Sequence, residues 1–365
     1  MTKEDVPLAH AGMASEIELQ KKYYEEGKIY ILQIESTLKC PQQCNYCYAG
    51  SLPDSPEGLT SSKIKSLLDS AAEMEVRMID WLGGDPLVRS DWYDLCKYAS
   101  DLGLINNIWT SGIPLANPEV AKKASEVTKS GFISTHLDTI NPELYSILHG
   151  GEGSNGDYTN IKLILKGIKN VLDAGKDPGA MVNCITYTTP LANGDAKSMI
   201  SYMQEEFGIK TCLTLFNPVI HRNANASWEP SIAQIEDAFT YRDLVNYPED
   251  PSCGPMDVSK FYCGTVVCVT SDGWLTPCSV IRTHEFGNVN DENLEVLVEN
   301  RKRRLLFLDF RDPSKLPGNC GDCRNNSFCF GCRSSAYYYE GDIMAVDPKC
   351  YQYNPTLERS KKTKV

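Results

Sequence analysis

The sequence predicts an α/β protein in which a parallel sheet is followed by a cysteine-rich C-terminal module. Two observations support this prediction. Short apolar runs alternate with amphipathic helical patterns six times between about residues 29 and 216, and nine of the 15 cysteines lie between Cys253 and Cys350. Repeated strand–helix units favour parallel strands joined by right-handed crossovers. The pattern fits an open (β/α)6 partial barrel or a doubly wound sheet, and both bind ligands at the carboxyl ends of their strands.

The strands are predicted from short apolar runs and the helices from apolar residues that recur every three or four positions. Thr60 is a good N-cap residue, and Pro118 suits the first turn of a helix. The six expected strands cover about 29–36, 77–82, 104–110, 131–137, 179–187 and 210–216. The helices between them are expected from about Thr60, at 90–102, from Pro118, and near 142–148, 158–174 and 195–207.

Changes in composition along the chain suggest five segments. A polar lead-in precedes the barrel, and a connector with a helix near 231–245 follows it. Beyond the connector, proline and cysteine become frequent and periodicity weakens. The predicted segments are 1–28 (lead-in), 29–225 (barrel), 226–252 (connector), 253–353 (cysteine-rich module) and 354–365 (basic tail).

Charge and hydropathy exclude several classes of protein. The net charge is −12, which argues against a nucleic-acid binder, because such a protein presents a basic face. No apolar run approaches the roughly 20 residues that span a bilayer, so no membrane association is expected. The N-terminus has no apolar signal segment, which predicts a cytoplasmic protein. In that compartment 15 cysteines indicate metal or redox chemistry rather than disulfides.

Three cysteines are concentrated in Cys40-Pro-Gln-Gln-Cys44-Asn-Tyr-Cys47, directly after the first predicted strand. Three thiolates this close in sequence can share one [4Fe–4S] cluster. The fourth iron then has no protein ligand, and an open metal position is where a substrate or cofactor binds. A zinc knot or three free thiols is the alternative interpretation.

The spacing C-x3-C-x2-C, with the aromatic Tyr46 before the last cysteine, resembles the signature of radical S-adenosylmethionine (SAM) enzymes. The resemblance implies a partial barrel whose open iron binds SAM. Reduction then cleaves SAM to methionine and a 5′-deoxyadenosyl radical, which removes a hydrogen atom from the substrate. It also implies a one-electron reductant such as ferredoxin or flavodoxin, and a reducing cytoplasm.

The segment after the second strand, Gly83-Gly84-Asp85-Pro86, resembles the Gly-Gly-Glu-Pro motif with which this family binds the SAM amino group. Two glycines at a strand end allow backbone to approach a ligand closely. A plain turn is the alternative. Asp85 stands where the family usually has glutamate.

The resemblance implies further SAM or substrate contacts at later strand ends. His136 and Asp138 alternate along the fourth strand and are candidates for contact with SAM or for acid–base roles, unless one caps the next helix. Asn183 matches a position that often contacts SAM, with strand hydrogen bonding as the alternative. Arg222 is a candidate anion ligand, and His221 is either an acid–base group or a loop residue.

The C-terminal cysteines resemble the SPASM domain, a module that holds two auxiliary [4Fe–4S] clusters in radical SAM enzymes. Two C-x2-C pairs alone would also suit zinc. The resemblance assigns one cluster to Cys320, Cys323, Cys329 and Cys350, and the other to Cys263, Cys278, Cys332 and an upstream cysteine. Cys253 is preferred for that position over Cys268, which falls in a hairpin that turns at Asp272-Gly273.

The remaining cysteines, Cys96, Cys184 and Cys212, are expected to be buried small hydrophobic residues. The predicted function is hydrogen-atom abstraction leading to oxidative modification of a peptide or peptide-like precursor. Ser279 counts against the sulfatase-maturing branch, which has aspartate there, and the short lead-in lacks the winged-helix module of many peptide-modifying relatives. A small-molecule dehydrogenase, epimerase or decarboxylase acting on a tetrapyrrole or sugar is the alternative. A non-catalytic electron carrier or zinc scaffold is the more distant one.

Overall fold

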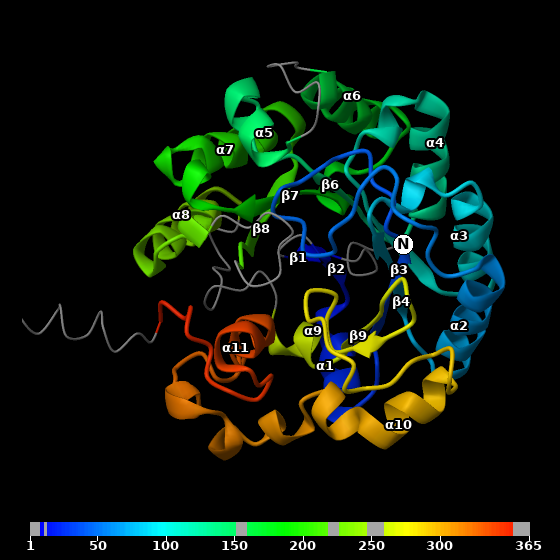
Figure 1. Ribbon diagram of the computed structural model, residues 1–365, viewed down its shortest axis with the longest axis vertical. Helices are drawn as coiled ribbons and strands as arrows, with labels where there is room; N and C mark the ends of the chain where they lie inside the picture. The colour runs from blue at the N-terminus through cyan, green and yellow to red at the C-terminus, as the bar shows by residue number, and fades with distance from the viewer. Residues whose placement is uncertain (1–7, 11–12, 151–158, 218–225, 247–258, 353–365) are drawn as a thin grey trace, which may run out of the picture.

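A computed structural model describes residues 8–10, 13–150, 159–217, 226–246 and 259–352. Its main sheet has eight strands in the order β10-β9-β3-β4-β5-β6-β7-β8. Strands β3 to β8 run parallel, and β8 and β10 are the two edges, so the sheet does not close. This is the partial barrel that the sequence predicts. Figure 1 shows helices α2, α3, α4, α6, α5 and α7 in this order around the outside of the strands.

The predicted elements of the barrel are all present, with bounds that differ by a few residues. The barrel strands are β3 (Ile31–Thr37), β4 (Met78–Gly83), β5 (Ile105–Trp109), β6 (Ile133–His136), β7 (Met181–Tyr187) and β8 (Lys210–Leu215). The helices around them are α2 (Ser61–Glu73), α3 (Trp92–Asp101), α4 (Pro118–Val127), α5 (Pro142–Leu148), α6 (Thr159–Asp173), α7 (Asp195–Phe207) and α8 (Ile232–Asn246). The Thr60 side chain caps α2 by accepting a hydrogen bond from the backbone of Lys63, as predicted.

The flanking regions contain shorter elements. A small antiparallel pair and one helix precede the barrel: β1 (Leu8–His10), β2 (Met13–Ser15) and α1 (Ile17–Glu26). The C-terminal module contains α9 (Lys260–Cys263), β9 (Val266–Val269), β10 (Leu275–Thr276), α10 (Leu294–Leu305) and α11 (Arg333–Glu340). In Figure 1 this module, coloured yellow to red, occupies the part of the ring that the barrel helices leave open.

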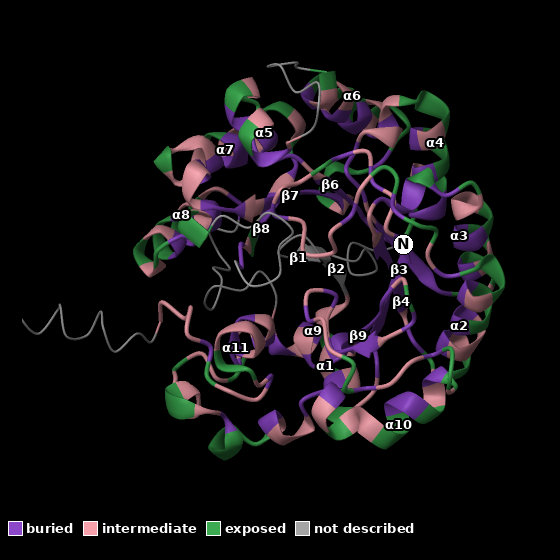
Figure 2. Ribbon diagram, in the orientation of Figure 1, coloured by how far each residue is buried: buried purple, intermediate pink, exposed green. Residues whose placement is uncertain are grey.

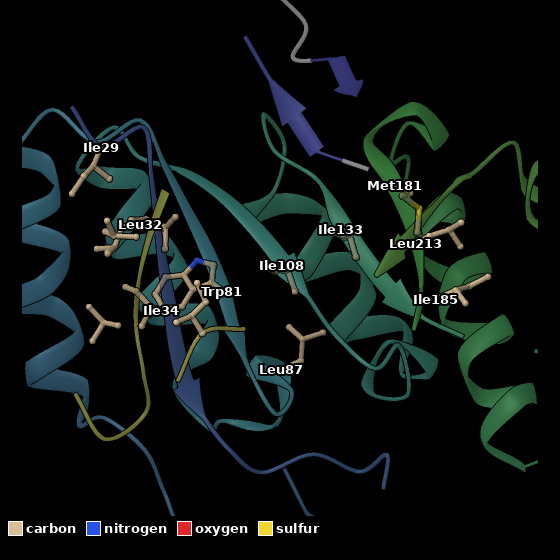
Figure 3. Packing of buried hydrophobic residues seen from close by; sticks show 14 of the residues in the cluster. Ile29, Leu32, Ile34, Trp81, Leu87, Ile108, Ile133, Met181, Ile185 and Leu213 are labelled. Carbon is tan, nitrogen blue, oxygen red and sulfur yellow. The ribbon is translucent and has the colours of Figure 1, made fainter. Parts of the chain in front are cut away.

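The main hydrophobic core lies between the strands and the surrounding helices. Alternate strand residues such as Ile34, Trp81, Ile108 and Ile185 point to this side, and Figure 3 shows them in one continuous layer. Figure 2 shows buried residues along the strands and exposed residues on the outward faces of the helices. Because side chains alternate along a strand, the intervening residues face the barrel interior.

The interior of the barrel is packed with both apolar and polar side chains. The buried Asp80 carboxylate accepts hydrogen bonds from Gln33 (3.2 Å), Asn107 (2.8 Å) and Tyr262 (3.2 Å). Tyr262 belongs to the C-terminal module and the other three residues belong to the barrel. The two parts of the chain therefore share a polar layer.

The hairpin predicted at Asp272-Gly273 forms, and it also extends the barrel sheet. Strands β9 and β10 pair antiparallel, and β9 pairs parallel with β3, which aligns Gln33 with Cys268. The sequence predicts the hairpin but not this long-range pairing. Its consequence is that the cysteine-rich module is attached to the strand that leads into Cys40–Cys47.

Candidate active site

The three cysteines of the N-terminal motif lie on one loop that leaves the carboxyl end of β3. The backbone N–H of Cys40 donates to the carbonyl of Leu52 (3.0 Å), and that of Cys47 donates to the carbonyl of Cys44 (3.2 Å). The Sγ of Cys47 accepts a hydrogen bond from the backbone N–H of Ser51 (3.4 Å). The loop therefore turns back on itself and brings the three thiols together.

Burial raises the pKa of two of these thiols. Desolvation raises the pKa of Cys40, and the nearby charges of Asp85 and Cys47 raise it further. Burial likewise raises the pKa of Cys44, together with Cys47 and Cys40. Thiolates in such a place need a compensating positive charge, and a coordinating metal deprotonates a thiol outright. The donor set therefore fits an iron–sulfur cluster better than three free thiols.

The two glycines at the end of β4 lie directly against the backbone that leads into the cysteine loop. The backbone N–H of Gly84 donates to the carbonyl of Thr37 (2.6 Å), and that of Asp85 donates to the carbonyl of Lys39 (2.8 Å). A Cβ on Gly83 would lie 1.9 Å from the carbonyl oxygen of Thr37, and one on Gly84 would lie 2.2 Å from that of Lys39. Only glycine allows the two backbones to approach this closely. The close approach predicted at Gly83-Gly84 is thus made to the cysteine loop itself.

The Asp85 side chain is fully buried and braces the same turn. Its carboxylate accepts hydrogen bonds from the hydroxyls of Thr110 (2.7 Å) and Ser111 (2.6 Å), and from the backbone N–H groups of Ser111 (3.0 Å) and Leu87 (3.1 Å). Burial raises the pKa of Asp85, and these hydrogen bonds oppose the rise. Because these hydrogen bonds occupy the Asp85 carboxylate, the backbone groups of the Gly83–Pro86 segment are the ones that can contact a ligand.

His136 and Asp138 lie together at the end of β6 and meet the cysteine loop through Tyr46. The Tyr46 hydroxyl donates to Asp138 Oδ2 and lies 2.7 Å from His136 Nε2. A residue that the sequence patterns do not indicate, His149, completes the network, with its Nε2 2.8 Å from Asp138 Oδ2. The backbone N–H of Thr186 donates to Asp138 Oδ1 (2.9 Å).

The charges of this network are coupled. Burial alone would raise the pKa of Asp138, but the charge of His136 and hydrogen bonds from His136 and His149 hold it below its usual value. Burial would lower the pKa of His136, but Asp138 raises it to about 10. Burial lowers the pKa of His149 despite the opposing effect of Asp138. The favoured arrangement is an ionised Asp138 that faces a protonated His136.

Asn183 lies on the helix-facing side of β7, which it shares with Met181 and Ile185. Its amide donates to the carbonyl of Leu137 (2.8 Å) and accepts from the N–H of Leu137 (3.1 Å). These two bonds fix the strand end that presents His136 and Asp138. The SAM contact expected for Asn183 stays a prediction.

The C-terminal cysteines form a second concentration of thiols. Burial raises the pKa of Cys263, and the neighbouring thiols of Cys332, Cys278 and Cys329 raise it further. Burial also raises the pKa of Cys278 to about 11. Cys263 thus lies near cysteines of both predicted sets, because Cys278 and Cys332 are assigned to one cluster and Cys329 to the other. Cys320 and Cys323 are likewise neighbours. The division of these cysteines between two clusters stays a prediction. Cys350 follows Asp347 after α11 and is partly buried.

Backbone N–H groups point at several of these sulfur atoms. Val280 donates to Cys278 (3.4 Å), Asn325 to Cys323 (3.5 Å), and Gly331 to Cys329 (3.3 Å). Hydrogen bonds of this kind stabilise and tune thiolate ligands. Among the described residues no three His, Cys, Asp or Glu side chains are gathered closely enough to hold a single metal ion.

The remaining predicted residues divide into two groups. Cys96, Cys184, Cys212 and Cys268 are buried, and the described cysteines form no disulfides. Cys253, His221 and Arg222 lie outside the described residues, and their roles stay predictions.

A buried ion pair ties the C-terminal module to the barrel beside the cysteine loop. The Arg282 guanidinium donates to both oxygens of Glu35, at 2.8 and 2.5 Å, and the Glu35 side chain is fully buried on β3. Arg282 also lies over the ring of Tyr48, which follows Cys47 directly. The N–H of Ser271 in the hairpin donates to the same carboxylate (3.2 Å). Sequence patterns do not reveal this contact, because its partners are 247 residues apart.

Fold and site together define an iron–sulfur enzyme built on a partial barrel. Comparison with known families identifies which class of iron–sulfur enzyme this is. The sequence model of the radical SAM superfamily matches residues 34–203, and that of the SPASM iron–sulfur cluster-binding domain matches residues 261–324. The chain belongs to the radical SAM superfamily and carries a SPASM domain. Its cofactors are SAM and [4Fe–4S] clusters.

Relatives with assigned activities match most of the chain at low identity. An AdoMet-dependent heme synthase of Methanosarcina barkeri is 25% identical over 358 residues, covering 88% of this chain and 95% of the relative. A probable GTP 3′,8-cyclase of Methanothermobacter thermautotrophicus is 24% identical over 297 residues, covering 76% of this chain and 92% of the relative.

Solved structures show the same fold. The enzyme anSMEcpe with bound AdoMet superposes with a TM-score of 0.67 at 17% identity, covering 93% of this chain and 96% of that one. SuiB of Streptococcus suis, bound to its precursor peptide SuiA, gives a TM-score of 0.63 at 16% identity, covering 92% and 79%. A search of the described residues for a helix long and apolar enough to cross a membrane found none.

Proposed function

We propose that this chain couples reductive cleavage of SAM to removal of a hydrogen atom from an unactivated C–H bond, and that the substrate leaves oxidised. When bound, the cluster and SAM supply the 5′-deoxyadenosyl radical that takes the hydrogen atom. The observation that carries the proposal is the position of the cysteine loop. It leaves the carboxyl end of β3, rests on the Gly83-Gly84 turn, and meets His136 and Asp138 at the active-site end of the barrel.

The ligand assignments are those that the family resemblance implies. Cys40, Cys44 and Cys47 would hold the SAM-binding cluster. The auxiliary clusters would be held by Cys320, Cys323, Cys329 and Cys350, and by Cys263, Cys278, Cys332 and Cys253. Iron–sulfur clusters carry single electrons, so auxiliary clusters that accept an electron from a substrate radical would favour an oxidative outcome over a redox-neutral one. A ferredoxin or flavodoxin in a reducing cytoplasm would supply the electron.

The protein's own side chains prepare the site in three ways. The glycine turn and Asp85 fix the cysteine loop. The Glu35–Arg282 pair holds the SPASM module against that loop. The network of Tyr46 and Asp138 packs beside the loop, and within it the Asp138 carboxylate is paired with His136 and His149. A buried, preorganised site of this kind excludes water from a reactive intermediate.

Two substrate classes have support. The family resemblance of the sequence favours a peptide or peptide-like precursor. The relatives named heme synthases favour a tetrapyrrole, because three of them match over 86–95% of their length. We rank the tetrapyrrole first, because the match to these relatives is one of sequence at 24–25% identity, whereas the peptide-bound structures share the fold at 16% identity.

The test is an anaerobic assay of the reconstituted enzyme with SAM and dithionite. Deoxyadenosine is measured alone, with iron-loaded porphyrins that bear propionate side chains, and with cysteine- or lysine-containing peptides. We expect a porphyrin to increase deoxyadenosine formation and to change mass by the loss of hydrogen or of a carboxyl group. A response to peptides alone would reverse the ranking. Fully loaded enzyme that forms no deoxyadenosine under any condition would contradict the proposed reaction.

A further inference from the structure

His149 connects the buried network to the cluster-binding loop, and no sequence motif gives it a role. Its Nδ1 lies 3.2 Å from Cys44 Sγ and its Nε2 lies 2.8 Å from Asp138 Oδ2. The side chain is completely buried. Its ring stacks on that of Tyr145, with centroids 4.2 Å apart and planes at 27°. The imidazole is therefore held between a carboxylate and a cluster ligand.

The direction of the contact with Cys44 follows from the chemistry of the ligand. A cysteine bound to iron is a thiolate, so it has no proton to donate and can only accept. The proton on the line between the two atoms must then belong to Nδ1 of His149. Nε2 also carries a proton when it donates to the ionised Asp138, so a ring that makes both contacts is an imidazolium.

We propose that His149 donates an N–H···S hydrogen bond to the Cys44 thiolate and thereby raises the reduction potential of the SAM-binding cluster, with Asp138 as the residue that positions it. The inference rests on the proposed function. Hydrogen bonds to cluster sulfur atoms are among the factors that set cluster potentials. Reduction adds negative charge to the cluster and its ligands, and a donor stabilises that charge, so the reduced state gains more from the bond.

The surroundings hold the ring in this orientation. Asp138 is itself fixed by the backbone N–H of Thr186 (2.9 Å) and by the Tyr46 hydroxyl. Tyr145, which stacks on the imidazole, accepts a hydrogen bond from the Gln42 amide (3.1 Å). Gln42 lies on the cysteine loop between Cys40 and Cys44. Movement of the ring would therefore disturb the loop as well as the hydrogen bond, and the position of the donor is well defined.

Two near-isosteric variants separate the bond to sulfur from the bond to Asp138. In His149→Asn the amide nitrogen takes the place of Nδ1 and can still donate to Cys44. In His149→Gln the amide nitrogen takes the place of Nε2, so it reaches Asp138 but not the sulfur. His149→Phe removes both donors. The matched control is His284→Gln, at an exposed histidine that stacks on Trp274.

The readout is the midpoint potential of the cluster whose electron paramagnetic resonance signal changes on addition of SAM, which separates it from the auxiliary clusters. We expect His149→Gln and His149→Phe to lower the equilibrium constant for reduction about tenfold, which is about 59 mV for one electron. His149→Asn and His284→Gln should stay near the wild type. Equal potentials in wild type, His149→Gln and His149→Phe would overturn the inference.

A second measurement needs no variant. Nitrogen-15 labelling of histidine should give a nitrogen coupling in the SAM-sensitive signal of the wild type, because spin density on the Cys44 sulfur reaches the donor across the hydrogen bond. Absence of that coupling would also overturn the inference. Absence of any SAM-sensitive signal in loaded wild-type enzyme would instead contradict the proposed function.

Discussion

The ion pair between Glu35 and Arg282 offers a direct test of how the SPASM module is attached to the barrel. Glu35 is fully buried on β3, and Arg282 follows the β9–β10 hairpin with 27% of its side chain exposed. Replacing Arg282 with methionine keeps much of the side-chain volume but leaves a buried carboxylate without its cation. Burial would lower the pKa of Arg282, but Glu35 raises it overall, which shows how strongly the two charges interact.

The size of the effect can be estimated from this geometry. Removing one partner of a buried pair costs about 3–5 kcal/mol, and the partial exposure of Arg282 favours the lower figure. Unfolding entropy is about 2.1 cal/mol/K per residue, so for 365 residues it is about 0.8 kcal/mol/K. A loss of about 3 kcal/mol therefore lowers the melting temperature by roughly 4 °C.

The assay is anaerobic thermal unfolding of the loaded enzyme, completed as a double-mutant cycle. Glu35→Gln keeps an acceptor for the N–H of Ser271 and removes the charge. We expect the double variant Glu35→Gln/Arg282→Met to be more stable than Arg282→Met, because no buried charge is left unpaired. A melting temperature of Arg282→Met within about 1 °C of the wild type, or a double variant that loses the sum of both single effects, would refute the reasoning.

Two further predictions concern the glycine turn and a buried lysine. Gly84→Ala should lower iron content and deoxyadenosine formation severalfold, because its Cβ would lie 2.2 Å from the Lys39 carbonyl oxygen. The control is Gly179→Ala, at an exposed glycine without a positive φ whose added Cβ would meet only the Asp177 side chain, at 3.3 Å, and it should keep both; equal loss in the two variants would contradict this. Burial lowers the pKa of Lys176 to about 8, below the value of about 10.4 in the unfolded chain, so the unfolded state binds more protons between these values and stability should rise with pH there. Between pH 7 and pH 10 the free energy of unfolding of the wild type should therefore rise by up to about 3 kcal/mol relative to that of Lys176→Met. A difference between the two free energies that stays constant over this range would contradict the prediction.

Much of the fold could be predicted because its signals are local. Thr60 and Pro118 mark helix starts through their own chemistry, and the alternation of apolar runs with amphipathic helices indicates a parallel sheet. The pairing of β9 with β3 could not be predicted. It depends on which of several apolar runs meets an open strand edge, and only the packed structure decides that.

The residues of the candidate site also fall into those that local sequence patterns indicate and those that only the structure reveals. Cys40, Cys44 and Cys47 are predicted by spacing, because ligands of one cluster must be close on a short loop. The family resemblance indicates His136 and Asp138 as candidates, strand alternation predicts only that they share a side, and their contact with SAM stays a prediction. His149 and Arg282 were missed, since each acts through a partner on a distant element and neither lies in a repeated pattern. Asp85 belongs to a recognisable motif, yet the hydrogen bonds that it accepts from Leu87 in its own turn and from Thr110 and Ser111 after β5 appear only in the structure.

The measurement that tests the account most directly is iron and sulfide content, with deoxyadenosine formation, in the wild type and in Cys44→Ala. Cys96→Ala is the matched control, because Cys96 is buried in α3 away from the proposed ligands. We expect about twelve irons per wild-type chain, as three [4Fe–4S] clusters require. Cys44→Ala should lose about a third of that iron and all deoxyadenosine formation, and Cys96→Ala should lose neither. Zinc in place of iron, or deoxyadenosine still formed by Cys44→Ala, would contradict the assignment of the Cys40–Cys47 loop.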